Sequence, residues 1–422
     1  MVFAIILFVV TYILMMLLPK WRPFIALGSA AIFIISGILP AGKALGCVDF
    51  NVLMMIAGTM GIVALVIDSK MPALLADIII EKVPNVKWAI VMLSLFAGVV
   101  SAFIDNVATV LMIAPIALAI AKKLNISPVG MIIAIAVSSN LQGAATLVGD
   151  TTSILLGGYA GMNFVDFFWY RSRPGIFFAV ELGALAATSL LLIMFKKETA
   201  PVASSERTKV ECWFPTVLMG GMVALLIGAS AIPDKPAMIN GIICMSLMAV
   251  GIVYNMIRKK SVLAAVEVLK EIDFATMTLL FGLFMVVGGI TEAGVIEKIA
   301  ALFSKLGGGS VFLVYTIITW VSVLFSAFID NIPYVATMLP VTQGIAAAMG
   351  IDPTVLYFGL LSGATLGGNL TPIGASANIT GIGILRKGGW EVKNSDFLKI
   401  GVPFTLAAVI PAYIFIWLVY GM

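Results

Sequence analysis

An internal repeat limits the folds open to this chain. The hexamer SAFIDN occurs at residues 101–106 and again at residues 326–331, each time between apolar runs. The dipeptide Asp49-Phe50 returns as Asp273-Phe274, at an offset of 224. From the hexamers onward the offset is 225, and the residues that recur are Gly143, Thr146, Gly149 and Ile154, matched by Gly368, Thr371, Gly374 and Ile379. An offset that changes by only one residue across so many polar and turn-forming positions predicts two structural repeats.

The composition places both repeats in a lipid bilayer. The chain has 422 residues, of which 61% are hydrophobic and only 11% are charged, too little polar surface to cover a soluble globule. A bilayer core of about 30 Å needs roughly 20 apolar residues per helix, so about ten crossings fit this length. We therefore expect an all-α polytopic integral membrane protein of the cell (inner) membrane, with the lipid bilayer as a partner.

Spans can be placed from the apolar runs. We expect them near 2–18, 24–41, 50–68, 128–159, 174–195, 213–231, 237–257, 273–291, 353–385 and 400–421. The polar stretch 196–212 then forms a cytoplasmic linker between a first repeat, 1–195, and a second, 213–422. Each repeat has five crossings, and an odd number inverts the second relative to the first. The charged apolar stretches 68–84 and 291–309 are predicted to be short interfacial helices.

Basic residues give the orientation. If the turn at 19–23 is cytoplasmic and later loops alternate, most of the 25 Lys and Arg residues lie inside. The residues left outside are Lys43, Arg171, Arg173, Lys235, Lys298 and Lys305. This bias follows the positive-inside rule and places both termini outside. The net charge of +4 is therefore a loop bias that gives no sign of nucleic-acid binding.

Several kinds of chemistry have no support in the sequence. Histidine is absent, which leaves carboxylates as the proton carriers available within the membrane. The three cysteines, Cys47, Cys212 and Cys244, lack the spacing of a disulfide framework or a metal site. No GxxxxGK[ST] loop occurs, so ATP-driven pumping is unsupported. We expect neither an enzyme nor an organic cofactor, with Na⁺ and/or H⁺ as coupling ions.

The two hexamers lie in apolar segments at 87–121 and 309–349 that begin and end on one side of the membrane. Two full spans and a re-entrant hairpin both satisfy this, and the short arms favour re-entrant hairpins with Asp105-Asn106 and Asp330-Asn331 at the tips. Each Asp either caps the helix that follows or binds an ion or proton. The cost of burying a charge favours the ion-binding interpretation.

A second pair of motifs interrupts two long apolar segments at 138–158 and 362–381 with Gly, Thr, Ser and Asn, which predicts broken helices. Packing through small residues is the alternative. The candidate ion- or substrate-binding residues of tips and breaks are Asp105, Asn106, Thr109, Asn140, Gly143, Thr146, Gly149, Asp150, Thr152, Ser153, Asp330, Asn331, Thr365, Asn369, Thr371, Gly374, Ser376 and Asn378. Asp150 has no acidic counterpart, because Ala375 occupies its place.

The motifs SAFIDNVATVLMIAPI, GAATLVGDTTSIL, SAFIDNIPYVATMLP and GGNLTPIGASANI closely resemble those of the melanosomal P-protein and the bacterial D-type sodium/proton antiporters, relatives of arsenite permeases in the ion transporter superfamily. The resemblance runs from about Asp49 to the C-terminus. It implies a homodimer and an elevator mechanism in which hairpins and broken helices form the binding sites. Where relatives commonly have Gly-Asp-Pro-Pro-Asn, this chain has Gly149 to Ser153 as Gly-Asp-Thr-Thr-Ser.

A sodium/proton antiporter is the first functional hypothesis, because Asp105, Asp150 and Asp330 are acidic residues expected near the midplane of the membrane and no Lys or Arg lies within the motifs. Na⁺ would contact Asp105, Asn106, Asp330 and Asn331. A sodium- or proton-coupled symporter of a small organic anion such as a dicarboxylate is an alternative, although the tip aspartates would repel a dianion unless they were protonated or sodium-bound. An arsenite/proton exporter is a third, and a membrane receptor or scaffold would explain neither repeats nor buried acids.

Overall fold

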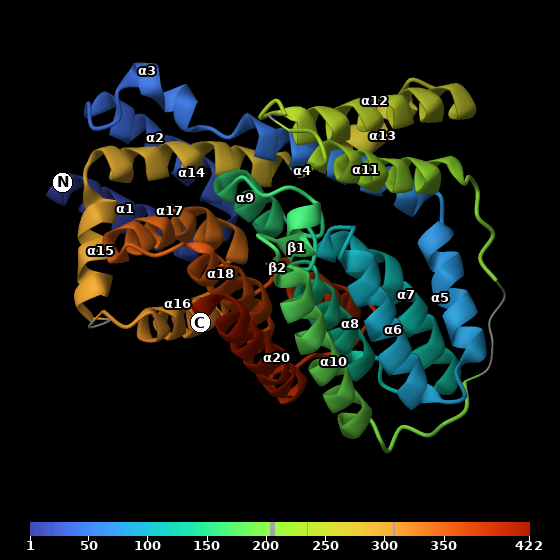
Figure 1. Ribbon diagram of the computed structural model, residues 1–422. Helices are drawn as coiled ribbons and strands as arrows, with labels where there is room; N and C mark the ends of the chain where they lie inside the picture. The colour runs from blue at the N-terminus through green and yellow to red at the C-terminus, as the bar shows by residue number, and fades with distance from the viewer. Residues whose placement is uncertain (203–206, 234, 307–308) are drawn as a thin grey trace.

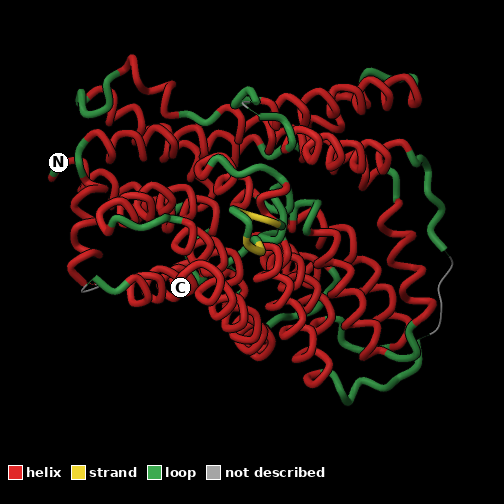
Figure 2. Tube along the Cα trace, in the orientation of Figure 1, coloured by secondary structure: helices red, strands yellow, loops and turns green. Residues whose placement is uncertain are grey.

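The structure is a computed structural model that describes residues 1–202, 207–233, 235–306 and 309–422, and helices make up nearly all of it (Figure 2). Its two strands, β1 (Trp169–Tyr170) and β2 (Arg173–Pro174), form one small antiparallel hairpin. Within the described ranges, seven helices are long and apolar enough to cross a membrane, or eight if α1 and α2, bent by 120°, form one span. Residues 203–206 of the expected linker lie outside the described residues.

The helices follow the chain in two matching series. The first series is α1 (Val2–Leu17), α2 (Arg22–Ile35), α3 (Ala41–Ala44), α4 (Phe50–Asp68), α5 (Met71–Lys82), α6 (Val86–Ser101), α7 (Asn106–Leu124), α8 (Val129–Gln142), α9 (Thr151–Ala160) and α10 (Ile176–Met194). The second is α11 (Phe214–Ser230), α12 (Ile239–Lys259), α13 (Leu263–Lys270), α14 (Phe274–Glu292), α15 (Val295–Leu306), α16 (Val311–Ser326), α17 (Asn331–Met349), α18 (Thr354–Gly367), α19 (Ser376–Lys387) and α20 (Asn394–Ile416).

Both predicted breaks are present. The expected span 128–159 consists of α8 and α9, and the span 353–385 consists of α18 and α19. Helices α6 and α7 form one helical hairpin, and α16 and α17 form the other, while α5 and α15 occupy the two predicted interfacial stretches. The span expected at 24–41 ends earlier, at Ile35, because the chain turns at Gly37, whose φ is +72°. Helix α13 was not predicted.

Each half of the chain packs one of its helices against the other half. Helix α12 packs along α4, and α2 packs along α14, in the upper layer of Figure 1. The contacts are close, because a Cβ on Gly58 would lie 2.4 Å from the Cys244 carbonyl carbon and a Cβ on Gly282 would lie 2.8 Å from that of Ala26. These glycines are 224 positions apart, so the repeat in sequence is also a repeat in packing.

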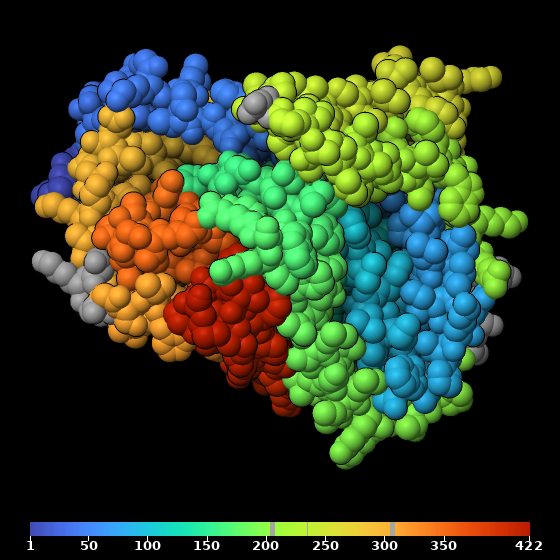
Figure 3. All heavy atoms as spheres, in the orientation of Figure 1, coloured from blue at the N-terminus to red at the C-terminus, as the bar shows by residue number. Residues whose placement is uncertain are grey.

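The broken helices also cross between halves. Helix α9 contacts α17 of the second hairpin, and α19 contacts α7 of the first. Helices α10 and α20 pack against each other, and Figure 3 shows the green and red segments side by side. This exchange brings both hairpin tips and both breaks to the middle of the molecule.

The described part of the linker is attached to the first half. The Glu211 amide donates to the Ser69 carbonyl at 3.1 Å, and Arg207 contacts the Glu81 carboxylate through two nitrogens at 2.7 and 2.6 Å. Lys70 also pairs with Glu211 at 2.7 Å, and its hydrogen bond lowers the pKa of that carboxyl below its usual value. These exposed ion pairs fix the route of the linker and contribute little stability.

Candidate functional site

Each hairpin tip is built around an Asp that caps the second arm. Asp105 Oδ1 accepts hydrogen bonds from the amides of Val107 at 3.0 Å and Ala108 at 3.1 Å. Asp330 Oδ1 accepts from the Ile332 amide at 3.1 Å. These bonds satisfy free amides at the start of α7 and α17. Both residues therefore cap their helices, and each cap uses one oxygen of the carboxylate.

The second oxygens differ between the two tips. Asp330 Oδ2 lies 3.1 Å from Arg22 Nη1 at the start of α2, with 19% of the Asp330 side chain and 22% of the Arg22 side chain exposed. Asp105 Oδ2 has no hydrogen-bond partner among the described residues. The repeat therefore provides one paired tip acid and one whose second oxygen is open.

Asp150 begins the second part of the first broken helix. Its Oδ1 accepts from the Thr151 amide at 2.8 Å, and its Oδ2 accepts from Thr152 Oγ1 at 2.9 Å. Asn331 Nδ2, from the opposite hairpin tip, also reaches Asp150 Oδ2 at 3.4 Å. Ala375 has the same extended backbone at the start of α19 but offers no side-chain cap. The two breaks are alike in backbone and unlike in charge.

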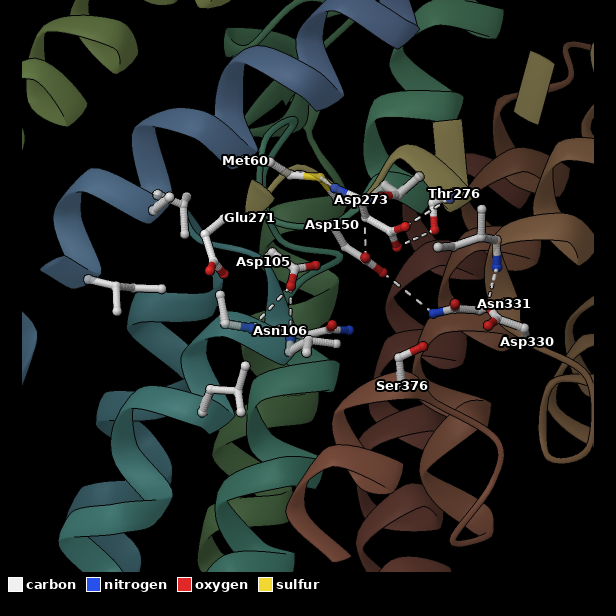
Figure 4. Close-up of a pocket in the computed structure, with 18 residues that line it drawn as sticks. Met60, Asp105, Asn106, Asp150, Glu271, Asp273, Thr276, Asp330, Asn331 and Ser376 are labelled. Carbon is white, nitrogen blue, oxygen red and sulfur yellow. Dashed lines mark hydrogen bonds between the residues drawn. The ribbon is translucent and has the colours of Figure 1, made fainter. Parts of the chain in front are cut away.

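A cavity of about 260 Å³ opens onto these groups (Figure 4). Its polar lining residues come from both hairpin tips, both broken helices and the start of α14, and they are Asp105, Asn106, Asp150, Thr151, Glu271, Asp273, Thr276, Asp330, Asn331 and Ser376. A side pocket of about 10 Å³, close to the space of one water molecule, lies between Asp105 and Asp150. The cavity thus gathers five carboxylates around a small volume.

A buried amide network lies behind the cavity and joins the two breaks. Asn106 Nδ2 donates to Asn140 Oδ1 at 2.9 Å, and Asn140 Nδ2 reaches Asn369 Oδ1 at 3.1 Å. Asn369 Nδ2 then donates to the Val137 carbonyl at 2.8 Å. Asn140 and Asn369 are fully buried. Since buried polar groups are costly when unpaired, this network fixes the first tip against both broken helices.

The other predicted residues do not line the cavity. Thr146 and Thr371 donate to the carbonyls of Ala102 and Ala327 next to the tips, and so hold each break against its own hairpin. The remaining predicted residues serve within the breaks or behind them. Ser153 and Asn378 bond to carbonyls of their own break, and Thr152 and Thr365 share a hydrogen bond. Gly149, which also lines the side pocket, and Gly374 allow close backbone packing, Gly143 lies against the Asp150 side chain, and Thr109 is buried in α7.

Five polar residues near the cavity were not predicted as site residues. Thr151 lines it from α9, Glu271 from the end of α13, and Asp273 and Thr276 from the start of α14, while Arg22 pairs with Asp330. Asp273 also caps α14 through the Thr276 amide at 2.9 Å. The repeat does identify Asp273 as the partner of Asp49, yet an Asp before an apolar run has the ordinary signature of a helix cap. In the sequence, Arg22 has only the signature of a cytoplasmic loop charge.

A second cavity of about 810 Å³ is lined by α4, α9, α14 and α17, which also line the first cavity. Helices α4 and α14 contribute opposite ends to the two cavities. Met60 and Val63 of the first cavity correspond to Phe284 and Val287 of the second, 224 positions apart. Asp273 corresponds in the same way to Asp49. None of the residues lining the second cavity belongs to a hairpin tip. Of these two related cavities, one reaches the tips.

In the described part of the chain, no three or more His, Cys, Asp or Glu residues are placed so that they could hold a metal ion together. The acids of the first cavity are therefore arranged one by one, each with its own hydrogen bonds, around the open space.

Paired hairpins and broken helices that meet at an acidic cavity define a membrane transporter. Residues 12–363 match the protein family CitMHS, described as "Citrate transporter", and the chain belongs to that family. An uncharacterized transporter of Mycobacterium tuberculosis is 32% identical over 333 residues, covering 78% of this chain and 76% of the relative. A "46 kDa membrane protein" of Mycobacterium leprae is 32% identical over 338 residues, covering 78% and 77%.

More distant comparisons give one relative by sequence and one by fold. The "P protein" of Homo sapiens is 25% identical over 402 residues, which cover 76% of this chain and 48% of that protein. The resemblance to the P-protein and the ion transporter superfamily is confirmed. The crystal structure of the Alcanivorax borkumensis YdaH transporter matches with a TM-score of 0.64 at 13% identity, over 96% of this chain and 98% of that one. That likeness shows the fold alone.

Proposed function

We propose that this protein is a secondary transporter that exchanges a small monovalent cation, with sodium as the first candidate, for protons. The carrying observation is Asp105, whose second oxygen is open and whose side chain lines both the cavity and the side pocket shared with Asp150. A carboxylate at membrane depth without a basic partner is stabilised by a bound cation or by a proton, and the two compete for the same oxygen. This competition is the simplest physical basis for antiport.

The two related cavities support alternating access. In an inverted repeat, exchanging the conformations of the two halves would close the first cavity and extend the second to the tips. The first cavity lies near the ends of α4 and α12, where Lys259 pairs with Asp68, so under the positive-inside rule it faces the cytoplasm. An elevator movement of hairpins and broken helices, within a homodimer, is the form we propose for this exchange.

Coupled symport of an organic anion is the second candidate, for two reasons. The family is described as a citrate transporter, and the start of α19 has no acidic cap, so its amides and Ser376 could receive a carboxylate. Because five carboxylates line the cavity, such an anion would have to enter with compensating cations or protons. The shared requirement of both candidates is cation or proton binding at Asp105.

The deciding experiment is a transport assay with the purified protein in proteoliposomes. Proton movement is followed with a pH-sensitive dye after addition of sodium, lithium, potassium, citrate, a dicarboxylate or arsenite. Antiport predicts proton release from the lumen on cation addition without an anion. A response that requires citrate or a dicarboxylate would favour symport instead, and a response to arsenite alone would contradict both candidates.

A further inference from the structure

Arg22 is held between a helix end and a hairpin tip. Its Nη1 donates to Asp330 Oδ2 at 3.1 Å, and its Nε donates to the Met15 carbonyl near the end of α1 at 3.1 Å. A guanidinium with bonds on two sides has a fixed direction, and it keeps its charge at any physiological pH. Asp330 therefore has a permanent positive neighbour that belongs to the protein.

Arg22 lies on α2 and Tyr12 on α1, and both helices are outside the two hairpins. Helix α2 packs against α14, where a Cβ on Gly289 would come within 2.5 Å of the Phe33 ring. From α1, the Tyr12 hydroxyl donates to the Pro333 carbonyl of α17 at 2.8 Å and also contacts Thr337. Arg22 and Tyr12 thus hold the second tip from outside.

The position equivalent to Arg22 in the other half carries no charge. Ala26 and Cys244 face Gly282 and Gly58, which are 224 positions apart, so these two residues occupy equivalent places in α2 and α12. Four residues earlier in each helix stand Arg22 and the uncharged Asn240. Asn240 lines the second cavity. Among the described residues, Asp105 forms no ion pair.

We infer that Arg22 is a fixed counter-ion that removes Asp330 from cation binding, so that Asp105 is the tip acid that exchanges cation for proton. The inference rests on the proposed function and deepens it, because it divides the roles of two acids that the repeat makes equivalent. A cation at Asp330 would be repelled by the guanidinium. Arg22 is thereby a residue that sets how many cations the cavity takes.

A double-mutant cycle, measured by the temperature midpoint of unfolding, tests the pairing of Arg22 with Asp330 without any transport assay. The full-length proteins are purified as wild type, Arg22→Gln, Asp330→Asn and the double variant. Each single substitution leaves one partly buried charge without its partner and should lower the unfolding midpoint, while the double variant should lose less than the two losses added together. The exposed pair Lys43 and Glu292, changed to Gln in the same way, is the control and should be additive. Additive losses for Arg22 and Asp330 would overturn the inference.

Transport measurements then test the role. Each single variant should slow sodium-driven proton flux by about tenfold or more, because an unpaired charge remains beside the cavity. The double variant should recover to within about threefold of wild type with the same ratio of protons to sodium, because the two losses are coupled. A double variant as slow as Asp330→Asn would make Asp330 a carrier and overturn the inference. If the wild type shows no cation-driven flux, the proposed function fails, and the pairing is then decided by the double-mutant cycle.

Discussion

The side-chain amide of Asn331 donates to Asp150 Oδ2 at 3.4 Å, and this contact joins the tip of the second hairpin to the break of the first. The two residues are 181 positions apart in the chain and belong to opposite repeats. The cavity is therefore shared between the halves, and a movement of either half changes the surroundings of Asp150. Transport-linked changes are expected at this contact before any other.

Asp105→Asn should abolish coupling between cation and proton movement while leaving folded protein in the membrane. Asn caps a helix about as well as Asp, so the bonds to the start of α7 can be kept while the open charged oxygen is lost. Cation-driven proton flux in proteoliposomes measures the effect. Asp396→Asn, a capping residue outside both cavities, is the matched control and should transport normally. Normal coupling in Asp105→Asn would exclude this residue as the carrier.

Asp150→Asn should shift the pH dependence of transport if Asp150 takes part in coupling. The substitution keeps an oxygen that can accept from the Thr151 amide. It removes the negative charge and the second oxygen, which accepts hydrogen bonds from Thr152 and Asn331. The cation-driven proton flux is measured at a series of pH values from about 5.5 to about 8.5. A residue that serves only as the cap of α9 would give an unchanged profile, because Asn replaces Asp well at this position.

Ala375→Asp is the complementary substitution. Ala375 begins α19 with φ −140° and ψ 146°, close to the −147° and 155° of Asp150, so a new carboxylate could cap the helix in the same manner. Such a cap is worth about 1 kcal/mol in other helices, and here it also adds a buried charge to the second half. We expect a changed ion preference in a panel of sodium, lithium and potassium. An unchanged preference would separate the second break from cation binding.

The sequence predicted the elements of the site better than their connections. The repeat placed Asp105 and Asp330 at tips, and Gly and Thr clusters placed the breaks, because these residues act through local backbone chemistry. The pairing of Arg22 with Asp330 spans 308 positions and depends on how α2 lies along α14. The pattern of apolar residues along the chain does not predict that packing. Because the two hexamers are identical, the sequence also does not show that one tip acid has a counter-ion and the other has none.

Asn369→Leu should destabilise the protein without adding a charge to the cavity. The substitution removes the acceptor of one Asn140 N–H, which leaves that N–H unpaired in a fully buried place, and it also removes the extra hydrogen bond to the Val137 carbonyl within α8. Each buried polar group left unpaired costs about 1–3 kcal/mol. The unfolding midpoint in detergent gives the effect, with the exposed residue Asn394 changed to Leu as the control. Equal midpoints for the two variants would contradict a structural role for the amide network.

Gly374→Ala should displace the second break from its hairpin tip. A Cβ at this position would lie 2.5 Å from the Gly368 carbonyl oxygen, 2.7 Å from that of Ser326 and 2.9 Å from that of Ala327. All three atoms are backbone, so no side chain can rotate away, and overpacking of this kind typically costs about 1–3 kcal/mol. Gly383→Ala is the matched control in α19, since nothing lies within 4 Å of its added Cβ. That control should gain about 0.5–1 kcal/mol, because Ala favours a helix over Gly.

The same change in the first half tests whether the two breaks obey one packing rule. A Cβ on Gly149 would approach the carbonyl oxygens of Gly143 at 2.7 Å and of Ala102 and Ser101 at 2.9 Å. Gly149→Ala should therefore lower the unfolding midpoint by an amount similar to Gly374→Ala, and both should slow transport because each break positions its hairpin tip. Midpoints equal to that of Gly383→Ala would show that the breaks can open without strain, and the close contact between break and tip would then not position the acids of the cavity.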